Sequence, residues 1–499
     1  MMNLVKSLCH GASFAILAWL APVTAHAAGQ ATVGDAVPGP TPFIADIPVT
    51  TSGASLAYAS FAVLSKPGSL VPPIASTYSA SYLSAHGYLS GSSLTVPVWG
   101  LYSGSNNNVA LLFVFTDGSI SFAIQPVTTN AYMDPCAEID QPSFAQNRTR
   151  ENQIGFNYFL LRDFCSSNSP AILDTDGNLR WVGTANVGSI PSILYNNGIY
   201  LSDGNTGVER MELTGQVSKI ADFGSIGVTS TNQHNMDRGR DGIVVDVNTA
   251  NETEGVAVEF DPTTGKVLNT WDMAQILSAA MAAGGDKFAD FVGSTYADWF
   301  HMNATAYNPA DGTEIISSRE NFVIDVDYDT PPDGVKKIHW ILGDTTKKWA
   351  SFPSLAKYAL TLGTNTLPPI GQHAVAIDPS GNLMLFDDGH GSDYEVPAGI
   401  ERGFSAGRSY KIDTAAMTAT EVINYTPSPN IFTPYCGSFY EPTSGSYLID
   451  FPDATTGNTE IQGLGKAFNV VFDLQYPEIN RCGSGWNAVP LTNLPLLFN

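Results

Sequence analysis

Hydrophobic residues alternate with small or polar ones over short runs in the first quarter of the chain. Ser93–Tyr102 (SLTVPVWGLY) and Val109–Gly118 (VALLFVFTDG) show this pattern, and turn residues separate such runs at Lys66–Gly68 and Ser103–Asn108. Alternation without a helical period predicts short antiparallel strands. We therefore expect residues 28–130 to form a small N-terminal β-sandwich.

A longer repeat follows, in which an acidic residue leads into a turn, a polar strand and an aromatic residue, as in DTDGNLRW. The copies begin at Asp174, Glu212, Asp261, Asp327, Asp413 and, in a degenerate form, Asp473. Their mean step is about 60 residues, whereas common propeller repeats have ~40–50 residues, so the difference leaves room for inserted loops. The chain is predicted to be all-β, with a six-bladed β-propeller over residues 131–499 behind the sandwich.

One insertion departs from the strand pattern. Residues Met273–Phe291 (MAQILSAAMAAGGDKFADF) are rich in Ala, Leu and Met, which favour helix. We expect a helix at the rim of the propeller, between an outer hairpin and His301.

The first residues have the composition of a cleaved leader. Lys6 precedes an apolar run over Phe14–Val23, and Ala25-His26-Ala27 matches a small-x-small cleavage pattern. We expect a signal peptide over residues 1–27 and export to the periplasm or the medium. No later segment approaches the ~20 continuous apolar residues of a membrane span.

The cysteines also suit an oxidising compartment. Removal of Cys9 with the leader leaves four, and an even number outside the cytosol favours disulfides. Proximity in the sequence favours the pairs Cys136–Cys165 and Cys436–Cys482, although four cysteines allow three pairings.

Charge excludes one class of partner. The chain has a formal net charge of −24, and only 14% of its residues are charged. Because nucleic acids and anionic membranes bind clustered Lys and Arg, we expect neither to be a partner.

Three histidines occupy the same place in copies of one local pattern. His234, His301 and His373 each precede a polar turn with Gly and then a hydrophobic strand, which reads IVVDV, TEIISS or LMLFD. Their separations of 67 and 72 residues are close to one blade each. In a propeller the innermost strands line the central channel, so the pattern predicts three imidazoles aimed at one point. A single histidine there would more commonly have a structural role.

One arginine has a position that suits anion binding. Arg319 follows the strand IISS of the His301 repeat and is expected near the channel, where a guanidinium can contact several oxygens of an oxyanion. A salt bridge at the surface or between blades is the alternative. We interpret the remaining histidines, His86, His339 and His390, as surface or packing residues.

Several short motifs surround these residues. They are Asp298–Asn303 (DWFHMN), Ser317–Asn321, Ile338–Gly343, Gly371–His373, Gly381–Asp387, Gly407–Asp413 and, in the sandwich, Pro97–Tyr102. Together they resemble the bacterial, exported aryl-sulfate sulfotransferases over most of the mature chain.

The resemblance implies an activity and roles for residues. It implies a six-bladed propeller that moves a sulfuryl group from a phenolic sulfate ester to a phenolic acceptor, without a nucleotide (PAPS) donor. The reaction would be ping-pong through a sulfohistidine on His373, with His301, Arg319 and His234 around the sulfuryl group. Either His234 or His301 would be the acid/base.

The chemistry explains these residue types. A sulfate ester repels anionic nucleophiles, whereas a neutral imidazole, with a pKa near ~6.5, can attack without losing a proton. Fixed donors would stabilise the oxygens in the transition state, and a second imidazole would protonate the leaving phenol. No cofactor and no metal are implied. The expected partners are a small phenolic donor and acceptor, and a homodimer is possible.

Two other functions remain open from the sequence. One is a non-catalytic propeller that binds a sulfated or aromatic ligand. The other is a metal-dependent hydrolase or lyase in which the three histidines bind zinc and leave a position for water. Against the second, Arg319 would repel a cation.

Overall fold

The computed structural model describes residues 27–162, 165–184, 191–293, 298–477, 482, 485–492 and 494–499. Strands dominate these residues and helices are few, which confirms the predicted all-β class. The expected signal peptide lies outside the described residues, except for Ala27. Among the described helices, none is long and apolar enough to cross a membrane.

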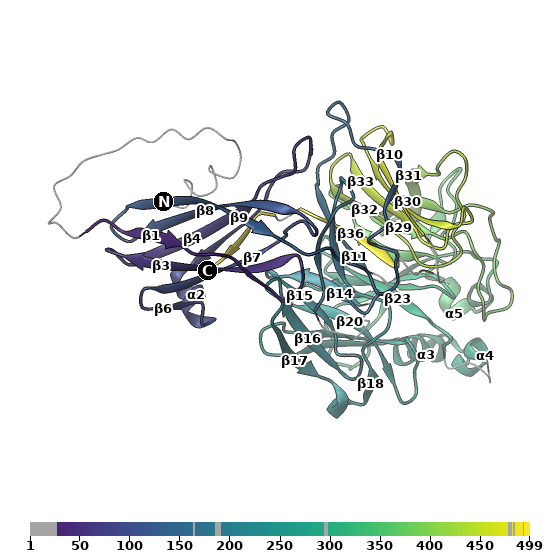
Figure 1. The fold of residues 1–499 in the computed structure, drawn as a ribbon. Coiled ribbons are helices and arrows are strands. Elements are labelled where there is room, and N and C mark those ends of the chain that lie inside the picture. Colours follow the sequence, from purple (N-terminus) through teal and green to yellow (C-terminus); the bar gives the residue numbers. More distant parts are fainter. Residues whose placement is uncertain are drawn as a thin grey trace.

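Two sheets form the first unit (Figure 1). The first has the order β1-β3-β7-β6, with β2 paired to β3; its strands are β1 (Gln30–Val33), β2 (Val37–Pro38), β3 (Ile44–Ser52), β6 (Leu89–Ser90) and β7 (Ser93–Trp99). The second has the order β37-β5-β4-β8-β9; its strands are β4 (Leu56–Val63), β5 (Ile74–Ser79), β8 (Asn106–Phe115), β9 (Ile120–Thr128) and β37 (Leu496–Phe498). A short helix, α2 (Ala80–Ala85), follows β5.

The core of this unit follows from the alternation in the sequence. Along β8 the side chains of Val109, Leu111, Phe113 and Phe115 are buried, while those between them are more exposed. A period of two places one set of side chains on the inner face, where the two sheets share one hydrophobic cluster. The predicted sandwich therefore has the expected strand pattern.

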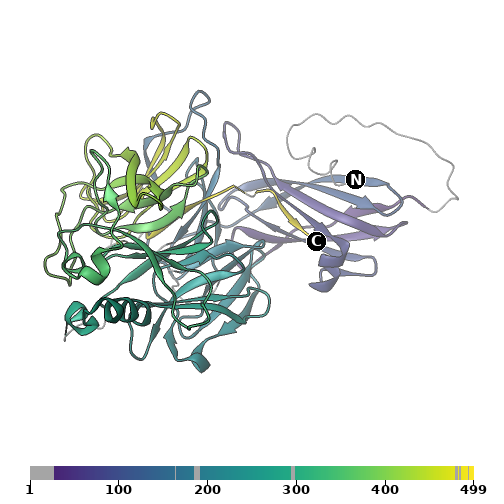
Figure 2. The ribbon, with the colours of Figure 1, turned by 180° about the vertical axis from the view of Figure 1, so that it is seen from behind.

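The last strand of the chain belongs to this first unit. Strand β37 pairs in parallel with β5, so that Leu496 lies opposite Ser76 and Phe498 opposite Tyr78. Figure 2 shows the end of the chain crossing from the second unit to the first. All residues after 130 are predicted to lie in the second unit, whereas β37 lies in the first.

Six sheets of the described residues form the second unit. The first, with order β36-β11-β12-β13, contains β11 (Tyr158–Arg162), β12 (Ala171–Asp174), β13 (Leu179–Val182) and β36 (Asn487–Leu491). The second contains β14 (Ser192–Tyr195), β15 (Gly198–Ser202), β16 (Gly207–Glu212) and β17 (Val217–Asp222). The third contains β18 (Val228–Ser230), β19 (Met236–Arg238), β20 (Ile243–Thr249), β21 (Val256–Phe260) and β22 (Val267–Asp272).

The other three sheets follow in chain order. The fourth contains β23 (Met302–Asn308), β24 (Thr313–Ser318), β25 (Val323–Asp327) and β26 (Ile338–Leu342). The fifth contains β27 (Thr361–Leu362), β28 (His373–Ile377), β29 (Leu383–Asp387), β30 (Ala406–Asp413) and β31 (Thr418–Tyr425). The sixth contains β10 (Ser143–Gln146), β32 (Ser438–Thr443), β33 (Ser446–Phe451), β34 (Asn458–Leu464) and β35 (Val470–Pro477).

The six sheets succeed one another as the blades of a propeller. Contacts between their inner strands run from β14 to β19, β23, β28, β32 and finally β36. Strand β36 comes from the end of the chain and completes the first sheet by pairing with β11, which joins the two ends of the repeat series. Hydrophobic clusters fill the spaces between neighbouring sheets.

The acidic repeat marks the outer hairpin of five sheets. Asp174 is typical, because its Oδ1 accepts hydrogen bonds from the backbone N–H groups of Asp176 (3.1 Å) and Asn178 (2.9 Å). An Asp that binds the backbone two and four residues ahead stabilises a tight turn. The prediction of a sixth acidic hairpin at Asp473 is wrong. Asp473 lies inside β35, and the turn between β34 and β35 has no acidic residue before it.

The predicted rim insertion is helical. Helix α3 (Met273–Gly284) begins at Asp272, whose side chain accepts from Gln275 N–H, and α4 (Phe288–Val292) follows. Two shorter helical segments, η2 (Lys348–Ser351) and α5 (Pro353–Ala356), come after β26, and η1 (Gly224–Ile226) precedes β18. Helices α3 and α5 are in contact.

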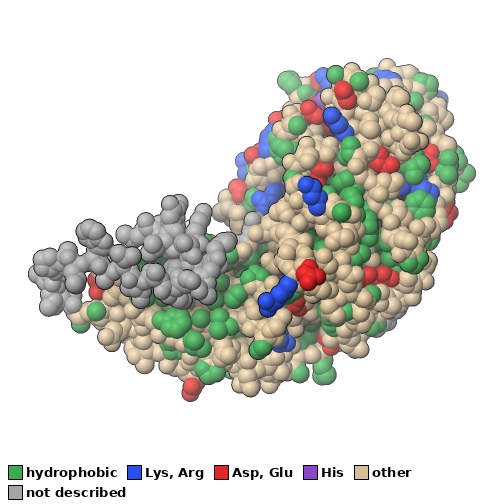
Figure 3. All heavy atoms as spheres, turned by 90° about the horizontal axis from the view of Figure 1, so that it is seen from above, with side chains coloured by type: hydrophobic (Ala, Val, Ile, Leu, Met, Phe, Trp, Pro, Cys, Tyr) green, Lys and Arg blue, Asp and Glu red, His purple; other side chains and the backbone are tan. Residues whose placement is uncertain are grey.

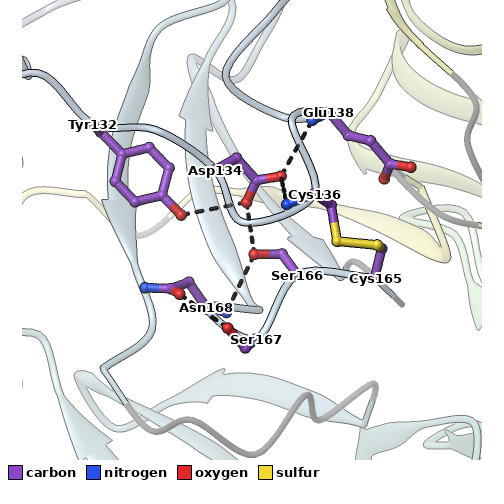
Figure 4. Close-up of a disulfide and its surroundings, with 8 residues drawn as sticks. All are labelled: Tyr132, Asp134, Cys136, Glu138, Cys165, Ser166, Ser167 and Asn168. Atoms are coloured by element: carbon purple, nitrogen blue, oxygen red, sulfur yellow. Dashed lines mark hydrogen bonds between the residues drawn. A yellow bond between two sulfur atoms is a disulfide. The ribbon is translucent and has the colours of Figure 1, made fainter.

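Both predicted disulfides are present, Cys136–Cys165 and Cys436–Cys482. In Figure 4 the carboxylate of Asp134 organises the first. It accepts hydrogen bonds from the Cys136 N–H (3.2 Å), the Glu138 N–H (3.2 Å) and the Ser166 hydroxyl (2.7 Å).

Candidate active site

The three patterned histidines meet at one end of three consecutive inner strands. His234 stands two residues before β19, His301 directly before β23, and His373 is the first residue of β28. The ring centroids of His234 and His301 are 4.6 Å apart, and those of His234 and His373 are 6.5 Å apart. His234 and His373 are each 5% exposed. The common register in the sequence has thus brought three imidazoles into one group, in which His234 and His373 are buried and His301 is partly exposed.

Hydrogen bonds determine the tautomer of His373. Its Nδ1 lies 3.0 Å from the carbonyl oxygen of Gly371 and 3.0 Å from Oδ1 of Asp388. A carbonyl oxygen can only accept, so the hydrogen bond with Gly371 requires the proton on Nδ1. The lone pair of the neutral ring is therefore on Nε2, at the opposite edge.

The surroundings keep this imidazole neutral. Burial lowers the pKa of His373 well below its usual value, and the positive charge of Arg319 lowers it further. Burial also raises the pKa of Asp388 well above its usual range, while Arg319 opposes this. A neutral imidazole with a fixed tautomer is a nucleophile that needs no prior deprotonation.

Arg319 is fixed by several acceptors. Its Nη1 lies 2.7 Å from Oε1 of Glu320 and 3.2 Å from Oδ2 of Asp393, and its Nη2 donates to the carbonyl of Pro434. The guanidinium also lies 5.0 Å from the ring centroid of Tyr435. Burial alone would lower the pKa of Arg319, but the neighbouring carboxylates raise it. Arg319 is therefore a buried, permanent cation. It lies near the histidines and also forms the ion pairs that were the alternative to an anion-binding role.

The carboxyl group of Glu254 lies between the other two histidines. Oε1 of Glu254 lies 3.5 Å from Nδ1 of His234, and Oε2 lies 3.0 Å from Nδ1 of His301. A second carboxylate, Asp298, is 2.6 Å from the same nitrogen of His301. Burial raises the pKa of Glu254, and the nearby carboxylates Asp298 and Asp246 add to this, whereas His234 opposes it.

The backbone at His301 is unusual. Its φ is 53°, and Ala374, beside His373, has φ 52°. Left-handed backbone at residues other than Gly costs about 1–3 kcal/mol and is common where a side chain must be aimed. The carbonyl of His301 accepts from the N–H of Arg319 at 3.0 Å, which ties the imidazole and the guanidinium to one backbone contact.

Within the described residues, three of these side chains could also hold a metal ion. One ligand atom each from His234, Glu254 and His301 lie within 4.8 Å of one another. Two imidazoles and a carboxylate are a donor set that zinc accepts. His373 is not in this group, so the geometry differs from the three-histidine zinc site considered from the sequence.

Four residues of the site were not found by sequence reasoning. Asp298 lies inside the DWFHMN motif and Asp388 follows the strand LMLFD, so both had a local signal. Glu254 lies in a loop without a repeated pattern, and the ring of Trp486 is 5.1 Å from that of His234 through a contact between the two ends of the repeat series. These two had no signal in a single sequence.

The other described histidines lie outside the group formed by His234, His301 and His373. His86 and His339 are exposed, and His339 pairs with Asp327 on an outer hairpin. His390 is intermediate in exposure and lies 3.3 Å from Asp393, which also binds Arg319. The hydrogen bond to Asp393 raises the pKa of His390.

On the face seen in Figure 3, Lys and Arg side chains of the described residues lie singly among other atoms and form no continuous basic patch.

Comparison with known proteins gives a family match. Residues 144–483 match the family model described as arylsulfotransferase (ASST). The arylsulfate sulfotransferase AssT of Escherichia coli O6:H1 is 26% identical over 204 residues, which are 32% of this chain and 33% of that protein. The arylsulfate sulfotransferase AssT of Lelliottia amnigena is 26% identical over 212 residues, 34% of each chain. The match thus spans about a third of the length of these relatives.

Solved structures are similar only at a general level. A Bacteroides thetaiotaomicron protein of unknown function aligns with a TM-score of 0.35 and 12% identity, covering 90% of this chain and 98% of that chain. A quinonprotein alcohol dehydrogenase-like protein from the same organism aligns with a TM-score of 0.32 and 9% identity, covering 89% and 93%. These scores are too low to support any argument about function.

Proposed function

Because the chain belongs to the arylsulfotransferase family, we propose that it transfers a sulfuryl group from a phenolic sulfate ester to a phenolic acceptor by a ping-pong reaction, without a nucleotide donor. The observation that carries this proposal is the state of His373. Its Nδ1 is bound to the Gly371 carbonyl, it is buried, and the charge of Arg319 helps to keep it neutral.

In the first half-reaction Nε2 of His373 attacks the sulfur of the donor ester. The bond from sulfur to the phenolic oxygen breaks, and its electron pair goes to that oxygen, which takes a proton from His234 or His301. Arg319 faces the sulfuryl oxygens, whose negative charge it offsets throughout. The products are a free phenol and a sulfohistidine.

In the second half-reaction the acceptor phenol loses its proton to the same imidazole group. Its oxygen attacks the sulfur, the N–S bond breaks, and the electron pair returns to Nε2 of His373. The carboxyl group of Asp388 lies 3.0 Å from the other ring nitrogen, where it can offset the positive charge of the sulfated ring. The site is then as it began, and no cofactor is consumed.

The cellular setting is part of the proposal. The expected leader and the two disulfides support an exported protein, in the periplasm or secreted. We propose residues 28–130 as the sandwich domain and 131–499 as the catalytic propeller, with the last strand returned to the sandwich. A homodimer stays a prediction, and sedimentation of the purified protein would test it.

The test is transfer from 4-nitrophenyl sulfate to phenol. We expect the wild type to be active and His373→Ala to lose at least about 10⁴-fold, because no other nucleophile replaces the ring. The matched control is His339→Ala, an exposed histidine on an outer hairpin, which should keep full activity. With donor alone, intact-mass measurement should show one added sulfuryl group in the wild type and none in the His373 variant. Turnover in the alanine variant would refute the role of His373.

A metal-dependent hydrolase is the second candidate, because His234, Glu254 and His301 form a possible zinc donor set. Metal analysis of the purified protein and assay after chelation decide between the two. Stoichiometric zinc together with activity lost on chelation and restored by zinc would overturn the sulfohistidine proposal.

A further inference from the structure

A pocket lies where the two units of the molecule meet. It has a volume of about 470 Å³, and small-molecule sites, which are common at domain junctions, have ~300–1,000 Å³. One wall is the sandwich loop between β4 and β5, at residues 66–70. The other walls include the segment after β10, at residues 147–150, and the hairpin turn between β12 and β13, at residues 175–178. None of the described residues that line the pocket belongs to the candidate active site.

Hydrogen bonds between the two units hold these walls together. The carboxylate of Asp176, on the propeller hairpin, accepts from the Ser69 hydroxyl and from the Leu70 N–H (3.3 Å) of the sandwich loop. The ammonium group of Lys66 donates to Oδ1 of Asn178 at 3.2 Å. The pocket is therefore preformed, and a ligand does not have to order its walls.

Positive side chains gather around this pocket. Lys66, Arg148 and Arg150 line it, and Asp176 is the one carboxylate among the described lining residues. The whole chain has 47 Asp and Glu residues and 23 Lys and Arg residues. Three cations beside one carboxylate thus reverse the charge balance of the whole chain.

Arg148 is half-buried and lacks a counter-charge. Its Nη1 donates to Oδ1 of Asn157 and Oγ1 of Thr175, both at 2.8 Å, and its Nη2 donates to Oε1 of Gln153 at 3.4 Å. All three acceptors are neutral, and the buried Nε has no hydrogen-bond partner in the described part of the chain. Burial lowers the pKa of Arg148, and the charge of Asp176 only partly opposes this. An anion beside the guanidinium would supply the missing charge.

Lys66 is in a similar state. Besides the amide oxygen of Asn178, its ammonium group contacts the ring of Tyr102, whose centroid is 4.5 Å away. Burial lowers the pKa of Lys66, and the charge of Arg180 lowers it further, whereas Asp174 opposes this. Asp174 binds Arg180 directly, at 3.1 Å. The two direct contacts of the Lys66 ammonium group therefore leave its charge without a neutralising partner.

We propose that this pocket binds a small organic anion through Lys66, Arg148 and Arg150. The group recognised is an oxyanion, either a carboxylate, a sulfate or a phosphate, because ammonium and guanidinium groups form charge-assisted hydrogen bonds with such oxygens. The pocket is larger than an inorganic oxyanion, and Leu70 and Phe144 in its lining can contact the apolar part of the ligand. The proposal does not depend on the proposed transfer reaction.

Acetylation of Lys66 gives a measurement at this pocket, separate from any anion bound at the histidines. The full-length protein is treated with acetic anhydride, and mass spectrometry of its peptides gives the rate at each lysine. The probes are sodium sulfate, sodium phosphate and sodium citrate, with sodium chloride at equal ionic strength as the reference. The probe that protects most strongly identifies the preferred oxyanion.

The expected result is slower acetylation of Lys66. With a Kd of about 1 mM, about 10 mM of a bound probe should slow the reaction about tenfold relative to sodium chloride. Lys219 is the control within the same molecule, because it is exposed and lies 2.7 Å from Asp222, outside the pocket. Its rate should not differ between the probes and sodium chloride.

Substitutions test the arginines. Arg148→Gln should weaken the protection of Lys66 by about tenfold or more, because it removes the buried cation. Arg150→Gln, at an exposed residue, should weaken it about threefold. Arg240→Gln is the matched control, since Arg240 is exposed and pairs with Asp329 at 2.7 Å, and it should keep full protection.

Two results would overturn the proposal. If no probe slows acetylation of Lys66 more than sodium chloride does, the pocket holds only solvent. If protection is undiminished in both arginine variants, the probes act elsewhere. Circular dichroism shows whether Arg148→Gln folds; if it does not, Arg150→Gln alone decides.

Discussion

The sandwich and the centre of the propeller bury different kinds of side chain. Among the described residues of 28–130, the buried set is apolar with six Thr, Ser and Asn side chains and includes no Asp, Glu, Lys or Arg. The centre of the propeller buries Arg319, Glu320 and Asp388 together with two histidines. One region is built for stability, and the other holds charges that would be more stable in water.

The difference extends to hydrogen bonding. In the described part of the sandwich, two buried side-chain oxygens lack a hydrogen-bond partner, one on Thr41 and one on Tyr102. Around the histidines alone, such atoms occur on His234, Glu254, Asp298 and Asp388. Each unsatisfied buried group costs about 1–3 kcal/mol. The hydrophobic sheets thus offset the cost of burying these polar atoms.

The largest expected effect is on the stability of the sandwich. Phe113 is fully buried on β8, so Phe113→Ala should lower the free energy of unfolding by about 3–5 kcal/mol, measured by denaturant titration. Activity per folded molecule should not change. Ile120, which is 63% exposed on β9, is the control, and Ile120→Ser should stay within about 0.5 kcal/mol. A loss of activity per folded Phe113→Ala molecule would break the proposed division between the two regions.

A substitution at Asp388 is expected to lower activity without lowering stability. Asp388→Asn removes the carboxyl group that can offset the positive charge of the sulfated ring, and transfer should fall about 10- to 100-fold, since a hydrogen bond to a charged group contributes about 1.5–3 kcal/mol. The loss should stay moderate because the Gly371 carbonyl still determines the tautomer. Stability should be unchanged or higher, because a neutral amide replaces a group whose charged form burial disfavours. Steady-state kinetics and thermal unfolding of the same variant check both parts.

The site should also remain active in mild acid. Burial lowers the pKa of His373, so the ring keeps its lone pair below the ordinary imidazole pKa of ~6.5. The burst of 4-nitrophenol in the first half-reaction should therefore change less than about twofold between pH 7 and pH 5.5. An ordinary imidazole would lose about tenfold at the lower pH, and such a loss would contradict the neutral, buried nucleophile.

The smallest effect concerns a carboxyl group in a propeller sheet. Burial raises the pKa of Asp473 to about 6. The folded form then binds more protons than the unfolded form between pH 4 and 6, so stability is present at low pH and is lost as the pH rises through this range. Asp473→Asn should raise the free energy of unfolding by about 1 kcal/mol at pH 8 and leave it unchanged at pH 4. Asp333→Asn, at an exposed turn, serves as the control in the same thermal scans.

Much of the fold could be predicted because its signals are local. Alternation along β8, the turns and five acidic hairpins each depend on a few neighbouring residues. The hairpin predicted at Asp473 is wrong because an acidic residue followed by an aromatic one also occurs inside a strand. The return of β37 to β5 had no signal, since a three-residue strand is paired by tertiary contact alone.

The residues of the site also differ in whether the sequence could predict them. His234, His301 and His373 could be grouped because a repeated register converts separation along the chain into proximity. Glu254 could not, because its place depends on a loop conformation and on contacts with Asn248 and Met302. The hydrogen bonds that give each histidine its state are likewise visible only in three dimensions.

The return of the chain end has a consequence for how the molecule is made. Strand β36 completes the first propeller sheet, and β37 completes a sheet of the sandwich. Residues 487–498 are made long after β11 and β5, so these two strands keep open edges until the later residues leave the ribosome, and open edges pair with other chains. Neither unit can therefore finish folding before residues 487–498 have been made. A chain that stops before residue 487 keeps both edges exposed and is expected to aggregate.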